Sequence, residues 1–354
     1  MNLQTNVTDD RAARRAAFDT RIREHGTAPL WEVFKGLAPN EPTAKGAPHV
    51  WRYDTLRPFV LEMSDLVSGE EAEIRSLVLE NPALKGQSKV LDTLYAAVQS
   101  VLPGEVVHAH RHVHTAVRMV IESKGAYSIV DGEKAVLHPG DFLVTPPWLW
   151  HGHGNETDEP AWWLDGIDLP QVLFYTAQFR DEFPGERYEP TKPAGDAIAR
   201  FGSALLPVTF SKGSTGSPLF VYPFDRTREA LAQLARGDEM DTAHGHRLRF
   251  ADPTTGGWVS RTLATWMQLL PAGFEGKVHR STESVVFKAI EGAGRVRVSE
   301  RDGAETEIEF GRDDIFCIPA WRGYRFDCAE DVVLYGYSDR AAQEALGVYR
   351  EAAA

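Results

Sequence analysis

Apolar and polar positions follow two different patterns along this chain. Residues 9–36 mix charged and apolar residues at helical spacing, which predicts one or two amphipathic helices. From about residue 85 the chain changes to short runs rich in Val, Ile, Leu and aromatic residues, interrupted by Gly, Pro and Asp. Such runs predict the strands of an all-β sandwich or barrel. Residues 227–240 predict a helix, and a second strand-rich block extends from about 258 to 340.

The two strand-rich blocks resemble each other in the order and spacing of their residues. Corresponding residues are Gly104 and Gly273, His110 and His279, Asp141 and Asp314, Pro146 and Pro319, and Trp148 and Trp321. We therefore predict two copies of one β-barrel, the first in residues 85–180 and the second in residues 258–354. Residues 1–84 are expected to form a helical and extended N-terminal segment, and residues 181–257 a helical connector.

Composition and charge limit the possible partners. A net charge of −13 over 354 residues argues against a broad surface for nucleic acid or anionic membranes. No apolar stretch reaches the roughly 18 residues of a membrane span, and the N-terminus lacks the apolar run of a signal peptide. Two cysteines, Cys317 and Cys328, are too few for a disulfide framework. We expect a soluble, cytoplasmic protein without nucleic-acid or membrane partners.

The stretch "EVVHAHRHVHTAVR", residues 105–118, holds four histidines at alternate positions: His108, His110, His112 and His114. Alternate side chains of a strand share a face, so parity predicts that all four rings point the same way. At roughly 3.3 Å per residue, four rings span too much length for one metal ion. Two neighbouring rings are the economical choice, with a further ligand from "PPWLWHGHGN", which contains His151 and His153. Neutral imidazoles suit Fe, Zn, Cu and Ni.

The spacing of these histidines resembles the two sequence motifs of the cupin family. Gly104, His110 and His112 resemble the first motif, and Gly140, Pro146, His151 and Asn155 resemble the second. The glutamate common in the first motif is missing, because Ala116 and Val117 occupy its zone. The resemblance therefore implies a three-histidine metal site made of His110, His112 and His151.

Longer segments resemble the gentisate 1,2-dioxygenases, a bicupin family of ring-cleaving iron enzymes that includes salicylate and 1-hydroxy-2-naphthoate dioxygenases. These segments include "VLDTLYAAVQSVLPGEVVHAHRH", "HPGDFLVTPPWLWHGHGN", "WWLDGIDLP" and "HRLRFADPTTGG". The resemblance implies an all-β bicupin of two double-stranded β-helix barrels, one Fe(II) per chain in the first barrel, and a homotetramer. It also implies insertion of O2 between the carboxyl- and hydroxyl-bearing carbons of a gentisate-type 2-hydroxybenzoate, which turns gentisate into maleylpyruvate. Val113 and His114 depart from the family pattern and leave the natural substrate open.

The same resemblance assigns three catalytic residues. Arg118 resembles the family arginine that contacts the substrate carboxylate, and its position six residues after His112 places it on the same face of a regular strand. His153 shares the face of His151 and is a candidate acid/base. Asp165 matches the family aspartate of "WLDG", which orients the ring hydroxyl or a neighbouring histidine. The alternatives are a surface arginine at a strand end and a turn aspartate.

Substrate-binding positions are assigned by parity and resemblance. Tyr95, Ala97 and Gln99 alternate on the strand before the metal motif and are expected to form one pocket wall, although core filling is the ordinary alternative. Arg75 is a further candidate contact for the carboxylate. His108 and His114 face inward by parity but lie outside the motif, so they are expected to neighbour the ligands or contact solvent.

In the second barrel the three-histidine pattern is not repeated. His279 keeps one ligand position, whereas Ser281 and Tyr324 stand at the other two. We therefore expect no metal there and a structural or assembly role for this barrel.

Several functions remain open from the sequence. Three neutral imidazoles leave up to three positions of an octahedral ion open and its 2+ charge uncompensated, which favours a chelating carboxylate with an ortho phenol. The dioxygenase could act on gentisate, salicylate, a 5-substituted salicylate or 1-hydroxy-2-naphthoate. Rival functions are a cupin isomerase or hydrolase that uses Mn or Zn, and a non-catalytic bicupin ligand sensor, for which the sequence shows no output segment.

Overall fold

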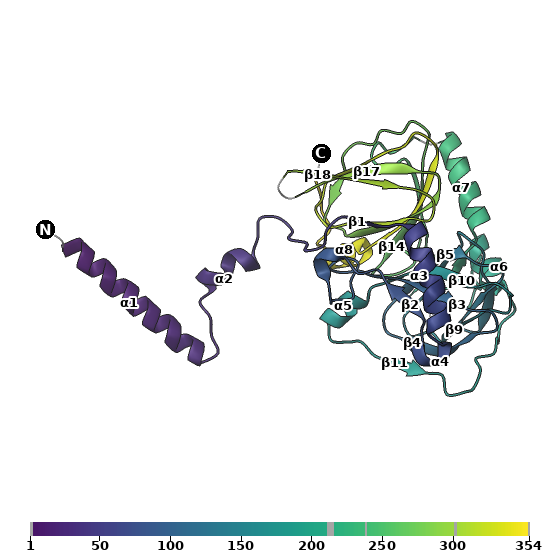
Figure 1. Ribbon diagram of the computed structural model, residues 1–354, viewed down its shortest axis with the longest axis horizontal. Coiled ribbons are helices and arrows are strands. Elements are labelled where there is room, and N and C mark those ends of the chain that lie inside the picture. Colours follow the sequence, from purple (N-terminus) through teal and green to yellow (C-terminus); the bar gives the residue numbers. More distant parts are fainter. Residues whose placement is uncertain (1–2, 211–215, 238, 301–302, 353–354) are drawn as a thin grey trace. The chain divides into compact units, whose positions relative to one another are not determined.

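The computed structural model describes residues 3–210, 216–237, 239–300 and 303–352, and the chain divides into two compact units, residues 1–43 and 44–354. The first unit holds helices α1 (Leu3–Glu24) and α2 (Leu30–Leu37) (Figure 1). An ion pair between Arg23 and Glu32 links the two helices. These are the two N-terminal helices expected from the sequence. Among the described residues, no helix combines the length and apolar character that crossing a bilayer requires.

The first barrel of the second unit consists of two antiparallel sheets. The six-stranded sheet has the order β12 (Val221–Tyr222), β8 (Phe142–Thr145), β5 (Ala116–Glu122), β10 (Ala161–Ile167), β3 (Tyr95–Val101) and β2 (Ser76–Val78). The five-stranded sheet has the order β11 (Arg180–Glu182), β4 (Val106–His112), β9 (His151–Gly154), β6 (Tyr127–Val130) and β7 (Glu133–Val136). We call this structure barrel 1.

Barrel 2 has the same plan. Its large sheet has the order β1 (His49–Trp51), β19 (Ile315–Ile318), β16 (Val285–Glu291), β21 (Val332–Ser338), β14 (Ala264–Leu270) and β13 (His246–Arg249). The opposite side holds β18 (Glu305–Phe310), β17 (Gly294–Ser299) and β20 (Tyr324–Asp327), together with the pair β15 (Arg280–Ser281) and β22 (Glu351–Ala352). The expected bicupin fold is confirmed.

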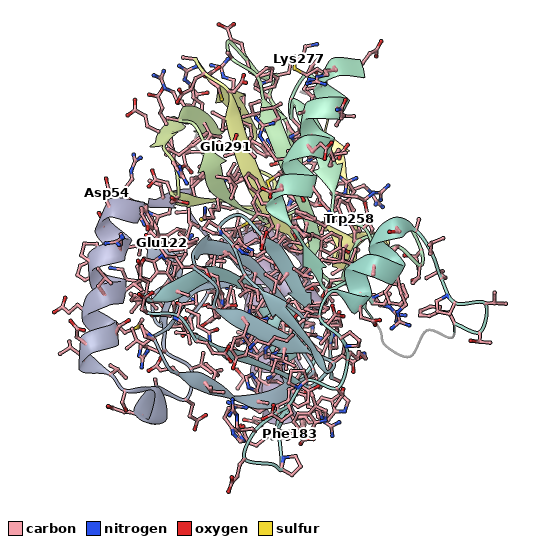
Figure 2. All side chains as sticks on the ribbon, turned by 90° about the vertical axis from the view of Figure 1, so that its right-hand side faces the viewer. Asp54, Glu122, Phe183, Trp258, Lys277 and Glu291 are labelled. Atoms are coloured by element: carbon pink, nitrogen blue, oxygen red, sulfur yellow. The ribbon has the colours of Figure 1, made fainter. Side chains whose placement is uncertain are left out.

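Helices complete the second unit at the ends and flanks of the barrels. They are α3 (Tyr53–Leu66), α4 (Gly69–Ala72), α5 (Leu169–Phe174), α6 (Asp196–Arg200), α7 (Phe224–Gly237) and α8 (Arg340–Leu346), with 3-10 turns η1 (Pro82–Leu84) and η2 (Phe201–Ser203). The helix expected at 227–240 is therefore α7, which begins three residues earlier, directly after Pro223. Figure 2 shows α3, which begins near Asp54, along one flank of barrel 1, and α7 beside barrel 2.

Matched hydrogen bonds confirm the internal repeat. The Trp148 amide donates to the His112 carbonyl at 2.8 Å, and the Trp321 amide donates to the Ser281 carbonyl at 2.7 Å. Both tryptophans have the same unusual backbone, with φ of 66° and 63°. Non-glycine residues rarely adopt positive φ, so its occurrence at both aligned positions indicates one shared turn geometry.

The repeat extends beyond the barrels themselves. The unit β1–α3–α4–β2 before barrel 1 has the same strand–helix–strand order as β12–α7–β13 before barrel 2, with the short helix α4 added. The first strand of each unit is exchanged: β1 pairs with β19 of barrel 2, and β12 pairs with β8 of barrel 1. Each barrel therefore depends on a strand that belongs to the other repeat.

Two hydrophobic clusters define the core. The larger one joins the outer faces of the two large sheets, where the rings of Phe142 and Tyr335 lie 5.7 Å apart. The smaller one fills the interior of barrel 2 with side chains such as Phe287, Phe316 and Phe326. The interior of barrel 1 instead contains buried histidines, an arginine and an aspartate. Because burying such groups without partners is costly, this interior is the candidate functional site.

Candidate metal centre and active site

Three histidines come together inside barrel 1. His110 and His112 lie on β4, and His151 begins β9, where it pairs with His110 in the strand register. One ring nitrogen from each residue lies within 4.8 Å of the other two, and the side chains are only 4%, 5% and 0% exposed. Within the described residues this is the single group of three or more potential metal ligands that meets that distance.

Backbone carbonyls determine the protonation of these rings. The Nδ1 atoms of His110, His112 and His151 lie 3.0, 2.8 and 3.0 Å from the carbonyl oxygens of His108, His114 and Leu149, respectively. A carbonyl can only accept, so each Nδ1 carries the proton and each Nε2 keeps its lone pair. The Nε2 of His151 is buried without a hydrogen-bond partner. An orphaned acceptor of this kind fits a divalent transition-metal ion as its missing partner.

Burial keeps the rings neutral, as metal ligands must be. Burial lowers the pKa of His110, and it lowers the pKa values of His112 and His151 well below the usual histidine range. Nearby positive charges, including Arg118, lower these pKa values further. All three rings are therefore available to a metal at neutral pH without loss of a proton.

His108 does not share the face of the other rings, contrary to the parity argument. The pairing of β4 with β9 shifts register between Val107 and His110, as at a β-bulge. A bulge inserts one residue and reverses the alternation of side chains. His108 is consequently exposed, and its Nε2 lies 3.2 Å from the Phe183 carbonyl oxygen.

His114 lies beyond the end of β4 and stacks on a ligand. Its ring centroid is 3.5 Å from that of His112, with an angle of 12° between the planes, and its Nδ1 lies 3.1 Å from Gln178 Oε1. Burial lowers its pKa to about 4. His114 therefore supports the orientation of His112 as a neutral neighbour.

Arg118 and Asp165 form a buried ion pair next to the histidines. Arg118 Nε lies 2.9 Å from Asp165 Oδ1, and Nη1 donates to Thr145 Oγ1 at 2.6 Å. Burial raises the pKa of Asp165 to about 6, against the opposing effect of Arg118. Asp165 lies within β10, so it is a strand residue and not a turn residue.

Arg118 reaches this position for a different reason from the one that parity suggested. The chain leaves β4 after His112 and enters the other sheet at Ala116, so the two residues do not share one strand. On β5, Arg118 pairs with Asp165 of β10 and Leu143 of β8, and paired residues share a face. The charges are therefore neighbours across adjacent strands.

His153 lies deeper in the same interior. Its Nδ1 lies 2.7 Å from Ser128 Oγ, and its ring is 5.2 Å from that of Trp163. Burial lowers its pKa well below the usual range, so the ring is neutral. Ser128, Thr145 and Trp163 were not identified from the sequence; for Trp163 the available signal was its position two residues before Asp165 on one strand.

Tyr95, Ala97 and Gln99 share one face of β3. They pair with Ile167, Asp165 and Trp163 of β10, respectively, which places them on the same side of the sheet as Asp165. Ala97 and Gln99 are buried and Tyr95 is half-buried. The structure therefore places these three residues on the sheet face that carries Asp165.

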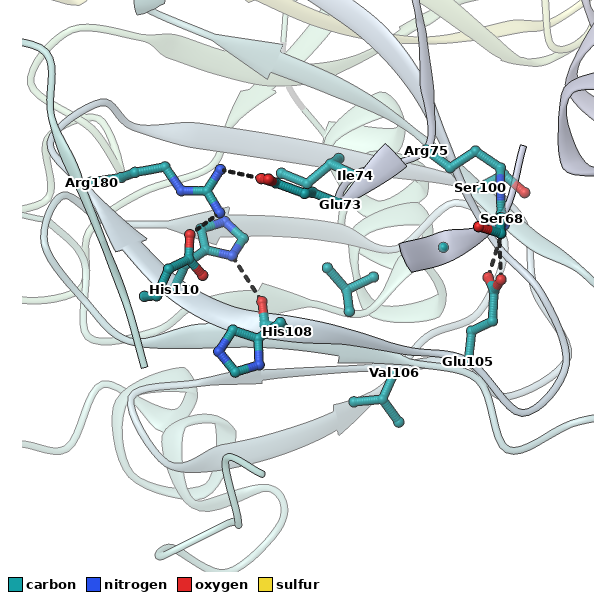
Figure 3. A pocket seen from close by; sticks show the side chains of 13 residues that line it. Ser68, Glu73, Ile74, Arg75, Ser100, Glu105, Val106, His108, His110 and Arg180 are labelled. Carbon is teal, nitrogen blue, oxygen red and sulfur yellow. Dashed lines mark hydrogen bonds and ion pairs between the residues drawn. The ribbon is translucent and has the colours of Figure 1, made fainter. Parts of the chain in front are cut away.

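Arg75 lines a cavity of about 680 Å³ that His110 also lines (Figure 3). Its Nη1 and Nη2 donate to the two carboxylate oxygens of Glu105, at 2.8 and 2.5 Å, and its Nε donates to the Val67 carbonyl at 2.7 Å. A bidentate pair of this kind is the strong form of an arginine–carboxylate contact. Arg75 is therefore already bound by the protein's own carboxylate.

Barrel 2 has different residues at the corresponding positions. The strand pairing aligns Phe287 with Arg118 and Phe326 with His153, while Tyr324 aligns with His151 and meets His279 in an isolated bridge. These aromatic rings belong to the apolar cluster inside barrel 2. The interior that is polar in one barrel is thus mainly aromatic in the other.

Comparisons with known proteins agree with this geometry. The cupin domain family matches residues 97–167. The chain is 40% identical over 338 residues to gentisate 1,2-dioxygenase 1 of Aquipseudomonas alcaligenes, covering 95% of this chain and 96% of that one. It is 33% identical to gentisate 1,2-dioxygenase of Streptomyces sp., covering 98% of both chains. The crystal structure of salicylate 1,2-dioxygenase from Pseudoaminobacter salicylatoxidans, described with gentisate adducts, has a TM-score of 0.88 at 31% identity, covering 96% of this chain and 93% of that one.

Proposed function

Because the chain belongs to the gentisate 1,2-dioxygenase family and is a ring-cleaving dioxygenase, we propose that it uses Fe(II) to open gentisate or a closely related 2-hydroxybenzoate. In the proposed reaction the bond between the carboxyl- and hydroxyl-bearing ring carbons is broken and each of these carbons receives one atom of O2, so that gentisate gives maleylpyruvate. The observation that carries the proposal is the convergence of three neutral histidines beside a buried arginine.

We propose that the Nε2 atoms of His110, His112 and His151 hold one Fe(II) per chain. When bound, the ion supplies open coordination positions for a chelating carboxylate and phenol and for O2. Fe(II) agrees with the all-nitrogen donor set and with the chemistry of the family, whereas Mn or Zn would suit the rival isomerase or hydrolase.

The remaining residues bind and orient the aromatic acid. Arg118 carries five N–H donors on three nitrogens. Its Nε contacts Asp165 and its Nη1 donates to Thr145, and we propose that the remaining N–H groups pair with the substrate carboxylate. Asp165 fixes the guanidinium and orients the ring hydroxyl. His153, neutral and bound at Nδ1 by Ser128, exchanges a proton with the ring hydroxyl groups.

We propose that Tyr95, Ala97 and Gln99 form the wall against which the aromatic ring packs. They share the face of Asp165, and Ala97 leaves more room than a larger residue would. We also propose Arg75 as a contact for the carboxylate, which requires its guanidinium to release Glu105.

Oxygen consumption tests this function directly. The metal-free protein, loaded anaerobically with Fe(II), is expected to consume O2 with gentisate and to give the absorbance of a ring-cleaved product. Salicylate, a 5-substituted salicylate and 1-hydroxy-2-naphthoate complete the panel and identify the preferred acid by kcat/KM. Loading with Zn serves as the control. If none of these acids supports O2 consumption by the Fe(II)-loaded protein, the proposal is refuted.

Activity is also expected to fall in acid. Burial raises the pKa of both Asp165 and Asp168 to about 6, and we assign the fall to Asp165 because it contacts Arg118 directly. Burial holds the pKa values of three neighbouring histidines well below the usual range: His112, His151 and His153. Asp165 loses its charge as the pH falls through about 6 and then no longer fixes Arg118. We expect kcat/KM to fall with a midpoint near pH 6.

The variant Asp165→Asn is the control for this assignment. It should be less active than the wild type at pH 7.5, and its pH profile should lack the step near 6. A step that persists unchanged in Asp165→Asn would assign the titration to another group.

We also propose a cytoplasmic location and a homotetramer. For the domains, we propose that residues 85–180 and 258–354 hold most of barrel 1 and barrel 2, with β2 and β12 added to the first barrel and β1 and β13 added to the second from outside these ranges. Both cysteines, Cys317 and Cys328, are free and buried, which suits a reducing compartment. Leu173, Phe174 and Tyr175 form an exposed apolar group on and after α5, which supports association between copies.

A further inference from the structure

One peptide group connects a metal-site histidine to a buried carboxylate. His112 Nδ1 donates to the carbonyl oxygen of His114 at 2.8 Å. The same peptide continues to Thr115, whose N–H donates to Asp168 Oδ1 at 2.8 Å. The chain of contacts therefore runs from the imidazole through a single peptide unit to the carboxylate.

Both carboxylate oxygens of Asp168 accept hydrogen bonds from other parts of the chain. The residue is 2% exposed and precedes helix α5, yet its side chain makes no capping hydrogen bond to that helix. Its second oxygen, Oδ2, accepts from Thr262 Oγ1, a residue of the other repeat that lies just before β14 of barrel 2. Both oxygens thus bind groups outside their own helix.

We propose that Asp168 is a positioning residue for His112, which it orients and makes more basic through the 114–115 peptide. The inference rests on the proposed function, because it assumes that His112 binds a metal. A negative charge at the N–H end of a peptide draws that N–H toward it and leaves more negative charge on the carbonyl oxygen. A stronger acceptor at Nδ1–H fixes the ring and strengthens the lone pair on Nε2, as carboxylates do when they bind metal-ligating histidines directly.

Barrel 2 repeats this arrangement without the histidine. Asp339 Oδ1 accepts from the Ser284 amide at 2.8 Å, and Oδ2 accepts from Thr93 Oγ1 at 2.6 Å. Ser281 occupies the position of His112 in this repeat, as the matched bonds of Trp148 and Trp321 show. The structural part of the role is therefore present in both barrels, whereas the link to a metal site exists only in barrel 1.

The exchange of partners also gives barrel 2 a part in the site. Thr262, which belongs to the second repeat, holds Asp168, and Thr93, which belongs to the first, holds Asp339. Barrel 2 thus contributes a hydroxyl that holds the carboxylate behind His112.

The two aspartates provide a matched pair of variants. Asp168→Asn keeps an oxygen for the Thr115 amide and removes the charge, whereas Asp168→Ala removes both. Asp339→Asn and Asp339→Ala make the same changes in barrel 2. For each protein we would measure thermal unfolding without metal, the affinity for Fe(II) and Co(II) against a competing chelator, and the visible spectrum of bound Co(II).

We expect the two Asn variants to lower the unfolding temperature by similar amounts. Asp168→Asn and Asp168→Ala should weaken metal affinity by about 10- to 100-fold, the range for residues that support metal-ligating histidines, and should shift the Co(II) spectrum. The Asp339 variants should bind metal within about twofold of wild type, because their changes lie in the other barrel. If the Asp168 variants do not fold, Thr262→Val and its counterpart Thr93→Val make the same comparison, with weaker binding expected for Thr262→Val alone.

Two results would overturn the inference, and they are distinguishable. Wild-type affinity and an unchanged Co(II) spectrum in the folded Asp168 variants would show that Asp168 is purely structural, while the proposed function would stand. Failure of the wild-type protein to bind either metal would refute the proposed function and this inference together.

Discussion

Replacement of His110 or His112 by alanine should abolish iron binding and ring cleavage, whereas His108→Ala should leave most of both. The two inner rings belong to the group whose nitrogens lie within 4.8 Å of one another, and His108 is turned outward by the bulge in β4. Loss of a group that merely supports a ligand costs about 10- to 100-fold in metal affinity or activity, so loss of a ligand should exceed that range. Iron content per chain and kcat with gentisate would measure the effect.

His151→Ala and His108→Ala complete this series. His151→Ala should match the two inner variants, because its buried Nε2 is the atom without a protein partner. Thermal unfolding of the metal-free variants shows whether each is folded, which separates loss of the ligand from loss of the barrel. Iron retained at the wild-type level by His110→Ala, or lost in His108→Ala, would contradict the assignment.

The bulge in β4 shows where reasoning from the sequence stops. The residue types and the repeat were sufficient to predict two barrels, and the resemblance to the cupin motifs selected His110, His112 and His151 from the histidine-rich segments. Parity treats a strand as regular, and a bulge is set by pairing with a partner strand that the local sequence does not reveal. His108 was placed on the wrong face for this reason.

Long-range pairing explains the other differences. The sequence did not predict that β1 and β12 are exchanged between the repeats, because strands of three and two residues are too short to show a periodic pattern and depend on their pairing partners. Likewise, Asp168 lies more than 50 residues from Thr115 and more than 90 from Thr262 along the chain. Contacts at that separation depend on how the two barrels pack, which local patterns do not encode.

The two barrels show how one fold accommodates opposite interiors. The matched turns at Trp148 and Trp321 keep the same backbone, while Arg118 in one barrel corresponds to Phe287 in the other. Barrel 2 buries an aromatic cluster and contributes stability, whereas barrel 1 buries charges that must be compensated by one another. The packing of the two outer faces in one shared cluster links the polar barrel to the apolar one.

Loss of Arg118 should be the second severe change. Arg118→Met removes the proposed partner of the substrate carboxylate, and truncating one member of a buried charge pair typically costs about 2–5 kcal/mol, or roughly one and a half to three and a half orders of magnitude in kcat/KM. Arg118→Lys should recover only part of the activity, because a lysine keeps the charge but not the bidentate fork. Steady-state kinetics with gentisate, together with iron content, would measure both variants.

Stability must be separated from binding in this test, because Arg118→Met also leaves Asp165 buried without its partner. Breaking a buried pair costs about 3–5 kcal/mol of stability, whereas removing both charges is often neutral. The double variant Arg118→Met with Asp165→Asn should therefore unfold near the wild-type temperature and remain inactive with normal iron content. Arg75→Met is the comparison for the second arginine, and since its guanidinium is bound by Glu105 it should raise KM less than Arg118→Met does. Activity regained in the double variant, or an equal rise in KM for Arg75→Met, would contradict the assignment of the carboxylate contact to Arg118.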